Sequence, residues 1–150
     1  MNEMEVEAKK WRKMLETTLP ENVILSLEHF DIIVHTNPAV FGQVRLLPKR
    51  LCSLTELSDS ENESMFKILR ALSSTMREFL RAEAVNFFAD SQVHSGKFLV
   101  EVAPRKTGDL PNDFIYEYFG NRKKSTTFLT SEEVNLLVSK LSTPLSILLK

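Results

Sequence analysis

Histidine and cysteine, which commonly serve as nucleophiles and zinc ligands, are few in this sequence. There are three histidines, His29, His35 and His94, and a single cysteine, Cys52. The histidines lack the close spacing of zinc ligands, so the sequence predicts no metal site. Cys52 cannot form a disulfide within the chain, and it would be a strong nucleophile only beside a histidine or a cation.

A segment near residue 100 has the alternating pattern of a β-strand. One set of alternate positions holds Phe98, Val100 and Val102. The interleaved set holds Lys97, Leu99 and Glu101. Because successive side chains of a strand point to opposite faces, we expect a strand over residues 97–103. The first set would face the core, and the second would lie on the opposite face of the sheet.

Hydrophobic patterning also predicts the elements that must position this strand. Further strands are expected at residues 23–27, 30–35, 42–48 and 84–88. Helices are expected at residues 2–16, 59–80 and 131–141. A capping box of Ser58 and Glu61 would start the long helix. Its expected buried stripe is Met65, Leu69, Leu72, Met76 and Phe79, widened by Phe66, Ile68 and Leu80.

The short connections between the strands favour an α+β arrangement, in which helices pack on one face of an antiparallel sheet. We expect a helical extension over residues 1–20 and one domain over residues 21–150. The 150 residues carry a net charge of −1 and are 43% hydrophobic, which is ordinary for a soluble domain and makes nucleic-acid binding unlikely.

Sequence features also bear on compartment and cofactors. No apolar run approaches the roughly 20 residues of a membrane span. The single cysteine and the charged N-terminus favour the cytoplasm, with the nucleus as the alternative. The sequence holds only four glycines, without the pattern of a phosphate-binding loop, and it predicts no cofactor.

Several short segments occur in a characteristic order. They are Gly42-Gln43-Val44, Leu54-Thr55-Glu56-Leu57, Lys106-Thr107-Gly108-Asp109 and Asn112-Asp113-Phe114-Ile115-Tyr116-Glu117. In order and spacing they resemble the histidine triad superfamily, most closely its fragile histidine triad branch. The resemblance implies a histidine triad fold: an antiparallel sheet with a long helix packed on one face and a C-terminal helix. It also implies a homodimer with joined sheets and a nucleotide site on the open sheet face.

The resemblance aligns the strand over residues 97–103 with the strand that carries the three histidines of the family. Lys97, Leu99 and Glu101 then stand at the three histidine positions. In the family the middle histidine attacks a phosphate and forms a covalent nucleotidyl intermediate. Leu99 has no lone pair with which to do so, and loss of a covalent nucleophile commonly costs on the order of 10⁶ in turnover.

The same alignment names candidate nucleotide-binding residues. Ile33 would line the base pocket, and His35 falls where the family often has an asparagine that binds the ribose. Lys97 could attract phosphate. Glu101 would oppose this, because it would place a negative charge where a polyphosphate lies.

Three functions stay open. The first is a catalytically degenerate protein, a pseudoenzyme that binds a purine nucleotide weakly or has a regulatory or interaction role. The second is a nucleoside or dinucleoside polyphosphate hydrolase, or a nucleotidyl transferase, that uses other residues such as His94 or His35. The third is a pure protein-interaction module without a nucleotide site, which would bind its partner through the N-terminal helix. The apolar stripe of that helix is Met4, Ala8, Trp11 and Leu15.

Overall fold

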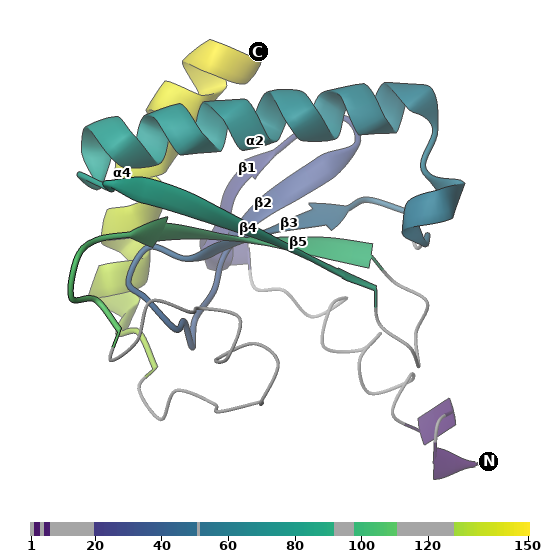
Figure 1. Cartoon of the computed structure of the whole chain (residues 1–150), viewed down its shortest axis with the longest axis horizontal. Helices are drawn as coiled ribbons and strands as arrows, with labels where there is room; N and C mark the ends of the chain where they lie inside the picture. The colour runs from purple at the N-terminus through teal and green to yellow at the C-terminus, as the bar shows by residue number, and fades with distance from the viewer. Residues whose placement is uncertain (1, 4, 7–19, 51, 92–97, 111–127) are drawn as a thin grey trace.

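Five strands form one antiparallel sheet, and two long helices cover one of its faces (Figure 1). The computed structural model describes residues 2–3, 5–6, 20–50, 52–91, 98–110 and 128–150, with the backbone alone described at 90 and 91. The strands are β1 (Val23–Ser26), β2 (Phe30–Val34), β3 (Val44–Pro48), β4 (Ala84–Ser91) and β5 (Phe98–Arg105). Their order across the sheet is β1-β2-β3-β5-β4, and every neighbouring pair is antiparallel.

The helical elements complete the two layers. They are α2 (Asp59–Phe79), α4 (Ser131–Leu149) and the short 3-10 helices η1 (Pro20–Asn22) and η2 (Leu54–Glu56). The α+β class is confirmed. The helix predicted over residues 2–16, and with it the stripe proposed for partner binding, lies mostly outside the described residues. No helix in the described part of the chain has the length and apolar character needed to cross a bilayer.

The alternation along β5 separates the two faces of the sheet. Phe98, Val100 and Val102 are almost fully buried in the main core, together with the inner faces of α2 and α4. Leu99 lies on the opposite face, where it belongs to a separate apolar cluster. The predicted division of this strand into two faces is therefore confirmed.

The buried side of α2 differs in part from the predicted stripe. Met65, Ile68, Leu72 and Met76 are buried, as expected. Phe66 is 63% exposed and Phe79 is 40% exposed, so these two predictions are wrong. Phe66 lies about 160° around the helix from Ile68, which turns it away from the core. Phe79 has the spacing of the buried stripe, but it is the last residue of α2 and stays partly exposed there.

Helix α4 is longer than predicted, because it continues beyond Leu141 to Leu149 and includes Pro144. Leu137, Leu141 and Leu145 are completely buried at a spacing of four residues, so the apolar stripe continues through the proline. The lack of an N–H at Pro144 removes one helical hydrogen bond. Burial of Leu145 on the far side of the proline shows that packing outweighs this loss.

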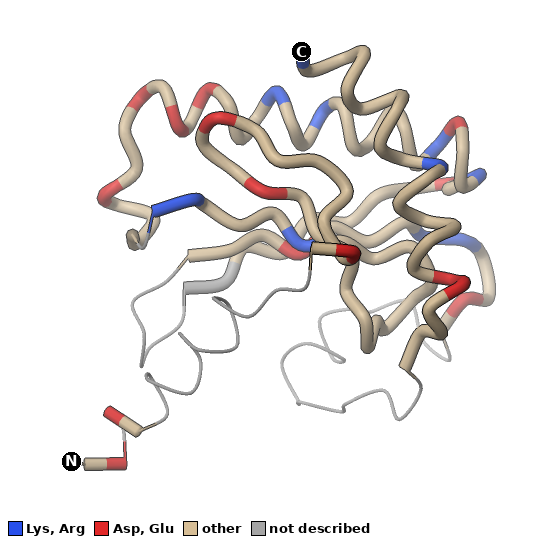
Figure 2. The backbone as a smooth tube through the Cα atoms, turned by 180° about the vertical axis from the view of Figure 1, so that it is seen from behind, with Lys and Arg blue, Asp and Glu red and all other residues tan. Residues whose placement is uncertain are grey.

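The predicted capping box at the start of α2 is present. Acidic residues gather at the start of this helix and basic residues lie further along it, as the helix dipole favours (Figure 2). The Glu61 N–H donates to the Ser58 hydroxyl (3.1 Å), and the Ser58 N–H donates to the Glu61 carboxylate (2.9 Å). This box satisfies two backbone N–H groups that the first turn would otherwise leave without partners.

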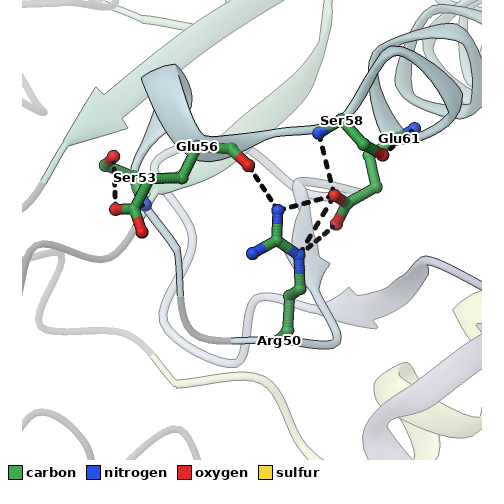
Figure 3. Close-up of polar contacts among 5 residues, drawn as sticks. All are labelled: Arg50, Ser53, Glu56, Ser58 and Glu61. Atoms are coloured by element: carbon green, nitrogen blue, oxygen red, sulfur yellow. Dashed lines mark hydrogen bonds and ion pairs between the residues drawn. The ribbon is translucent and has the colours of Figure 1, made fainter.

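Arg50 adds a second set of contacts to this helix start (Figure 3). Its guanidinium donates to both carboxylate oxygens of Glu61, at 2.7 to 3.0 Å, and to the carbonyl oxygen of Glu56. The Arg50 hydrogen bond, with the Ser58 N–H, lowers the pKa of Glu61 from 4.5 to about 2. Arg50 therefore ties the end of β3 to the start of α2.

Replacing Glu61 with glutamine should lower the melting temperature at pH 7 and reduce its dependence on pH. The lowered pKa of Glu61 means that its contribution is complete above about pH 4.5 and is lost as the pH falls toward 2. Melting curves from pH 7 to about pH 3 measure this. Glu63→Gln is the matched control, because Glu63 is exposed and its ion pair among the described residues is with Lys67, which is also exposed. Equal pH profiles for the two variants would contradict the assignment.

Candidate functional site

The face of the sheet opposite the helices carries a row of cross-strand neighbours. Ile33 on β2 pairs with Arg45 on β3, and Arg45 pairs with Glu101 on β5. Leu99 lies two residues earlier on β5, on the same face. These positions include three of the five residues that sequence analysis assigned to a site, and the structure brings them together. Of the other two, His35 is described below, and Lys97 lies outside the described residues.

Leu99 is packed rather than open. Only 2% of its surface is exposed, and it lies in a cluster with Ile33 and Leu47, each 6% exposed. Val23 on the neighbouring strand β1 packs against this cluster. A side chain buried to this degree cannot reach an attacking or leaving group. The position that the resemblance gives to the nucleophile is therefore occupied by a structural residue.

The Glu101 carboxylate is neutralised by residues that sequence analysis missed. It accepts a hydrogen bond from Arg45 Nε at 2.6 Å and another from Gln43 Nε2 at 3.0 Å. Glu101 is 6% exposed and Gln43 is fully buried. The expectation that Glu101 would present an unbalanced negative charge to a phosphate is wrong, because Arg45 supplies the opposite charge. Only the register of β3 against β5 reveals this pair, since 56 residues separate its members.

His35 joins the same cluster at the end of β2. Its Nε2 lies 2.9 Å from Arg45 Nη2 and 4.0 Å from the nearer Glu101 oxygen, and its Nδ1 faces the N–H of Asn37 at 3.1 Å. Burial, and then the charge of Arg45, lowers the pKa of His35 from 6.5 to about 3. The ring is therefore neutral near pH 7. A neutral imidazole accepts at one nitrogen only, so two donors compete for its single lone pair.

This neutral histidine should make the chain lose stability in acid. Below pH 6.5 the unfolded state binds a proton on His35 that the folded state excludes, down to about pH 3. His35→Gln should therefore flatten the profile by up to about 1.4 kcal/mol per pH unit within that window. Urea unfolding at a series of pH values measures the change. His29→Gln is the matched control, because His29 lies in the β1–β2 turn. The same flattening in both variants would contradict the account.

Comparisons with known proteins identify the fold. No protein-family model and no curated protein matches the sequence. The structure is similar to a histidine triad protein from Marinobacter aquaeolei, with a TM-score of 0.70 and 19% identity over 84% of this chain and 89% of that chain. It is also similar to a hypothetical histidine triad nucleotide-binding protein from Sulfolobus tokodaii, with a TM-score of 0.68 and 17% identity over 93% of each chain. The chain has the histidine triad fold.

A further match is the Caenorhabditis elegans NitFhit protein, with a TM-score of 0.59 and 18% identity over 80% of this chain. This chain spans only 27% of NitFhit. The fold predicted from the sequence segments is thus confirmed. The assignment to the fragile histidine triad branch and the alignment of the three histidine positions stay predictions.

Two residues that the predicted alignment places at histidine positions of the family are in direct contact. By resemblance, Gln43 falls at the histidine of the family's Pro-Gly-His segment and Glu101 at the third histidine of the triad. These two residues hydrogen-bond to each other. The preceding Gly42 has φ 95°, and a Cβ atom there would lie 2.9 Å from both Leu80 and Pro104. The fold therefore requires a glycine at position 42. The adjacent polar pair, Gln43 and Glu101, differs from the histidines that the resemblance leads us to expect.

The remaining chemistry-bearing residues form no second centre in the described part of the chain. Cys52 is 2% exposed. The nearest acid to His29 is Glu28, at 3.9 Å. No group of three histidine, cysteine, aspartate or glutamate side chains is placed to hold a metal ion among the described residues. His94 lies outside them.

Proposed function

We propose that this chain is a non-catalytic protein of the histidine triad fold, a pseudoenzyme that acts by binding other molecules. The observation that carries the proposal is Leu99, which is 2% exposed and packed with Ile33 and Leu47. The predicted alignment gives this position to the family's nucleophile. Because Leu99 is packed rather than open, we favour a regulatory or interaction role for this chain.

The neighbouring groups support the proposal because none of them replaces the nucleophile. Covalent nucleotidyl transfer needs an accessible lone pair on a group that can also leave. The Glu101 carboxylate is buried and takes two hydrogen bonds. The His35 ring faces donors at both nitrogens.

Weak nucleotide binding is the second candidate. The side chains of His35 and Arg45 are 16% and 22% exposed, so part of this polar cluster is accessible to a ligand. The likeness to the Sulfolobus tokodaii protein, described as nucleotide-binding, adds weight. Calorimetric titration with AMP and with CMP tests this candidate and its purine preference. Saturable sub-millimolar binding that Arg45→Met/Glu101→Gln abolishes would establish it, because this double variant removes the guanidinium and its buried partner charge together.

Turnover assays test the main proposal. Purified chain incubated with diadenosine tri- and tetraphosphate should give no more product than buffer, as followed by chromatography. His35→Ala and His94→Ala are the informative variants, because the alternative hydrolase would use one of these residues. Turnover by the parent chain that either variant abolishes would support that hydrolase and contradict the proposal.

The family resemblance also supports a homodimer. We propose this assembly, and sedimentation equilibrium tests it directly. A single species of twice the chain mass is the expected result, and a monomer over the whole concentration range would contradict it. Neither result depends on whether the chain is catalytic.

A further inference from the structure

The outward face of α2 carries a line of basic residues that the proposed function does not use. The line consists of Lys67, Arg70, Arg77 and Arg81. Spacings of three and seven residues place Lys67, Arg70 and Arg77 on one side of α2. Arg81 lies just beyond the end of this helix. All four are exposed, and they lie away from the buried Ile68 and Leu72. We call these four residues the basic stripe. Basic residues can be followed along this helix in Figure 2.

Most of this charge is not balanced by the described part of the protein. Lys67 pairs with Glu63 at 3.4 Å. Among the described residues, no acid lies within ion-pair distance of Arg70, Arg77 or Arg81. By contrast, Arg45 and Arg50 are both held by buried glutamates. Arg70 and Arg77 on one side of α2, and Arg81 just beyond its end, are thus available to a partner.

The backbone at Arg81 is a second, independent observation. Arg81 follows the C-cap Leu80 and has φ 56°, the left-handed conformation. Glycine is the usual residue there after a helix, because a Cβ atom makes this conformation unfavourable. Arg81 is the single non-glycine residue with a positive φ in the described segments. An arginine kept at a position that suits glycine indicates that its side chain has a use.

We infer that the basic stripe binds an acidic segment of a partner protein. The stripe is one residue wide and about 20 Å long, which matches an extended or helical peptide. Phe66, one turn before Arg70 and 63% exposed, offers the apolar contact that a peptide side chain could use.

This inference goes beyond the proposed function, since it names a surface and the chemistry of its partner. The basic stripe lies on the helical side of the molecule, whereas Leu99 and Glu101 lie on the opposite face of the sheet. An experiment can therefore contradict the proposed function without contradicting the inferred binding surface, and the reverse is also true. A catalytic chain could still bind an acidic protein, and a pseudoenzyme could lack this surface.

Fluorescence anisotropy with a labelled polyglutamate peptide of about 20 residues tests the inference at low salt. Arg70→Gln/Arg77→Gln/Arg81→Gln should weaken binding about tenfold or more, because three exposed ion pairs are lost. The control Lys140→Gln/Lys150→Gln removes charge from exposed positions of α4 and its end, and it should change affinity less than about twofold. Equal weakening by both variants, or no binding by the parent chain, would overturn the inference.

Arg81→Gly separates function from folding. It should raise the melting temperature, because glycine suits φ 56°, and it should weaken peptide binding severalfold. A merely structural arginine would give the first effect without the second, and that result would overturn the role of Arg81. Duplex DNA and phosphatidylserine vesicles are the competing probes. Tighter binding to either than to the peptide would overturn the choice of an acidic protein partner.

Discussion

Replacing Arg45 with methionine should lower the free energy of unfolding by about 3 kcal/mol. Methionine has a similar length but removes the charge that neutralises Glu101. The Glu101 carboxylate, which is 6% exposed, would then lose one of the two hydrogen bonds described above and keep the one from Gln43. Removal of one partner of a buried ion pair is costly because the other charge stays desolvated. Urea unfolding followed by circular dichroism measures the loss.

The matched controls decide whether the effect comes from this pair. Lys49→Met removes a cation from a partly exposed pair with Asp31 at 3.9 Å, and it should cost less than about 0.5 kcal/mol. Arg45→Met/Glu101→Gln removes both charges and keeps an oxygen that can accept from Gln43. This double variant should regain most of the lost stability. Equal losses for Arg45→Met and Lys49→Met, or a double variant as unstable as the single one, would contradict the account.

Replacing Leu99 with alanine should also cost about 3 kcal/mol. The side chain is buried against Ile33 and Leu47, so its removal leaves a cavity in a packed cluster. Leu54→Ala is the control, because Leu54 is 47% exposed. It should cost about 1 kcal/mol at most. A Leu99→Ala loss no larger than that of the control would show that this face is not packed as described.

Arg45 and Leu99 both lie on the face of the sheet opposite the helices. The sequence predicted which β5 side chains lie on this face, but it did not predict the residues that contact them. The period of two along β5 was enough to separate Phe98, Val100 and Val102 from Leu99 and Glu101. It could not reveal Arg45, because cross-strand pairing depends on register, which no local pattern encodes. An arginine within the strand predicted over residues 42–48, opposite a glutamate on another strand, was the available signal.

For the helices, too, local sequence patterns predicted only part of the structure. Ser58 and Glu61 predicted the start of α2 because a capping box is a local device. The exposure of Phe66 could not be predicted, since the spacing of apolar residues fits several neighbouring faces of a helix. The last helix was predicted over residues 131–141, yet α4 continues past Pro144, and Leu145 beyond the proline is buried. Tertiary packing, rather than local preference, decided both cases.

The fold could therefore be predicted further than the site. The order of short segments predicted the histidine triad fold, which similarity to solved structures confirms. The degenerate positions Lys97, Leu99 and Glu101 were assigned by resemblance, and the structure describes two of them. Leu99 is packed, which strengthens the case against it as a reactive position. Glu101 is neutralised by Arg45, which removes the charge conflict expected at this position.

A trapping experiment for the covalent intermediate tests the central claim most directly. The chain is mixed with diadenosine triphosphate labelled at the α-phosphate, quenched after short times in alkaline sodium dodecyl sulfate, which preserves a bond between phosphorus and a histidine nitrogen, and separated under denaturing conditions. The account predicts no label on the parent chain, because Leu99 offers no lone pair and is 2% exposed. Label that stays with the denatured parent chain, and increases with substrate to saturation, would contradict it.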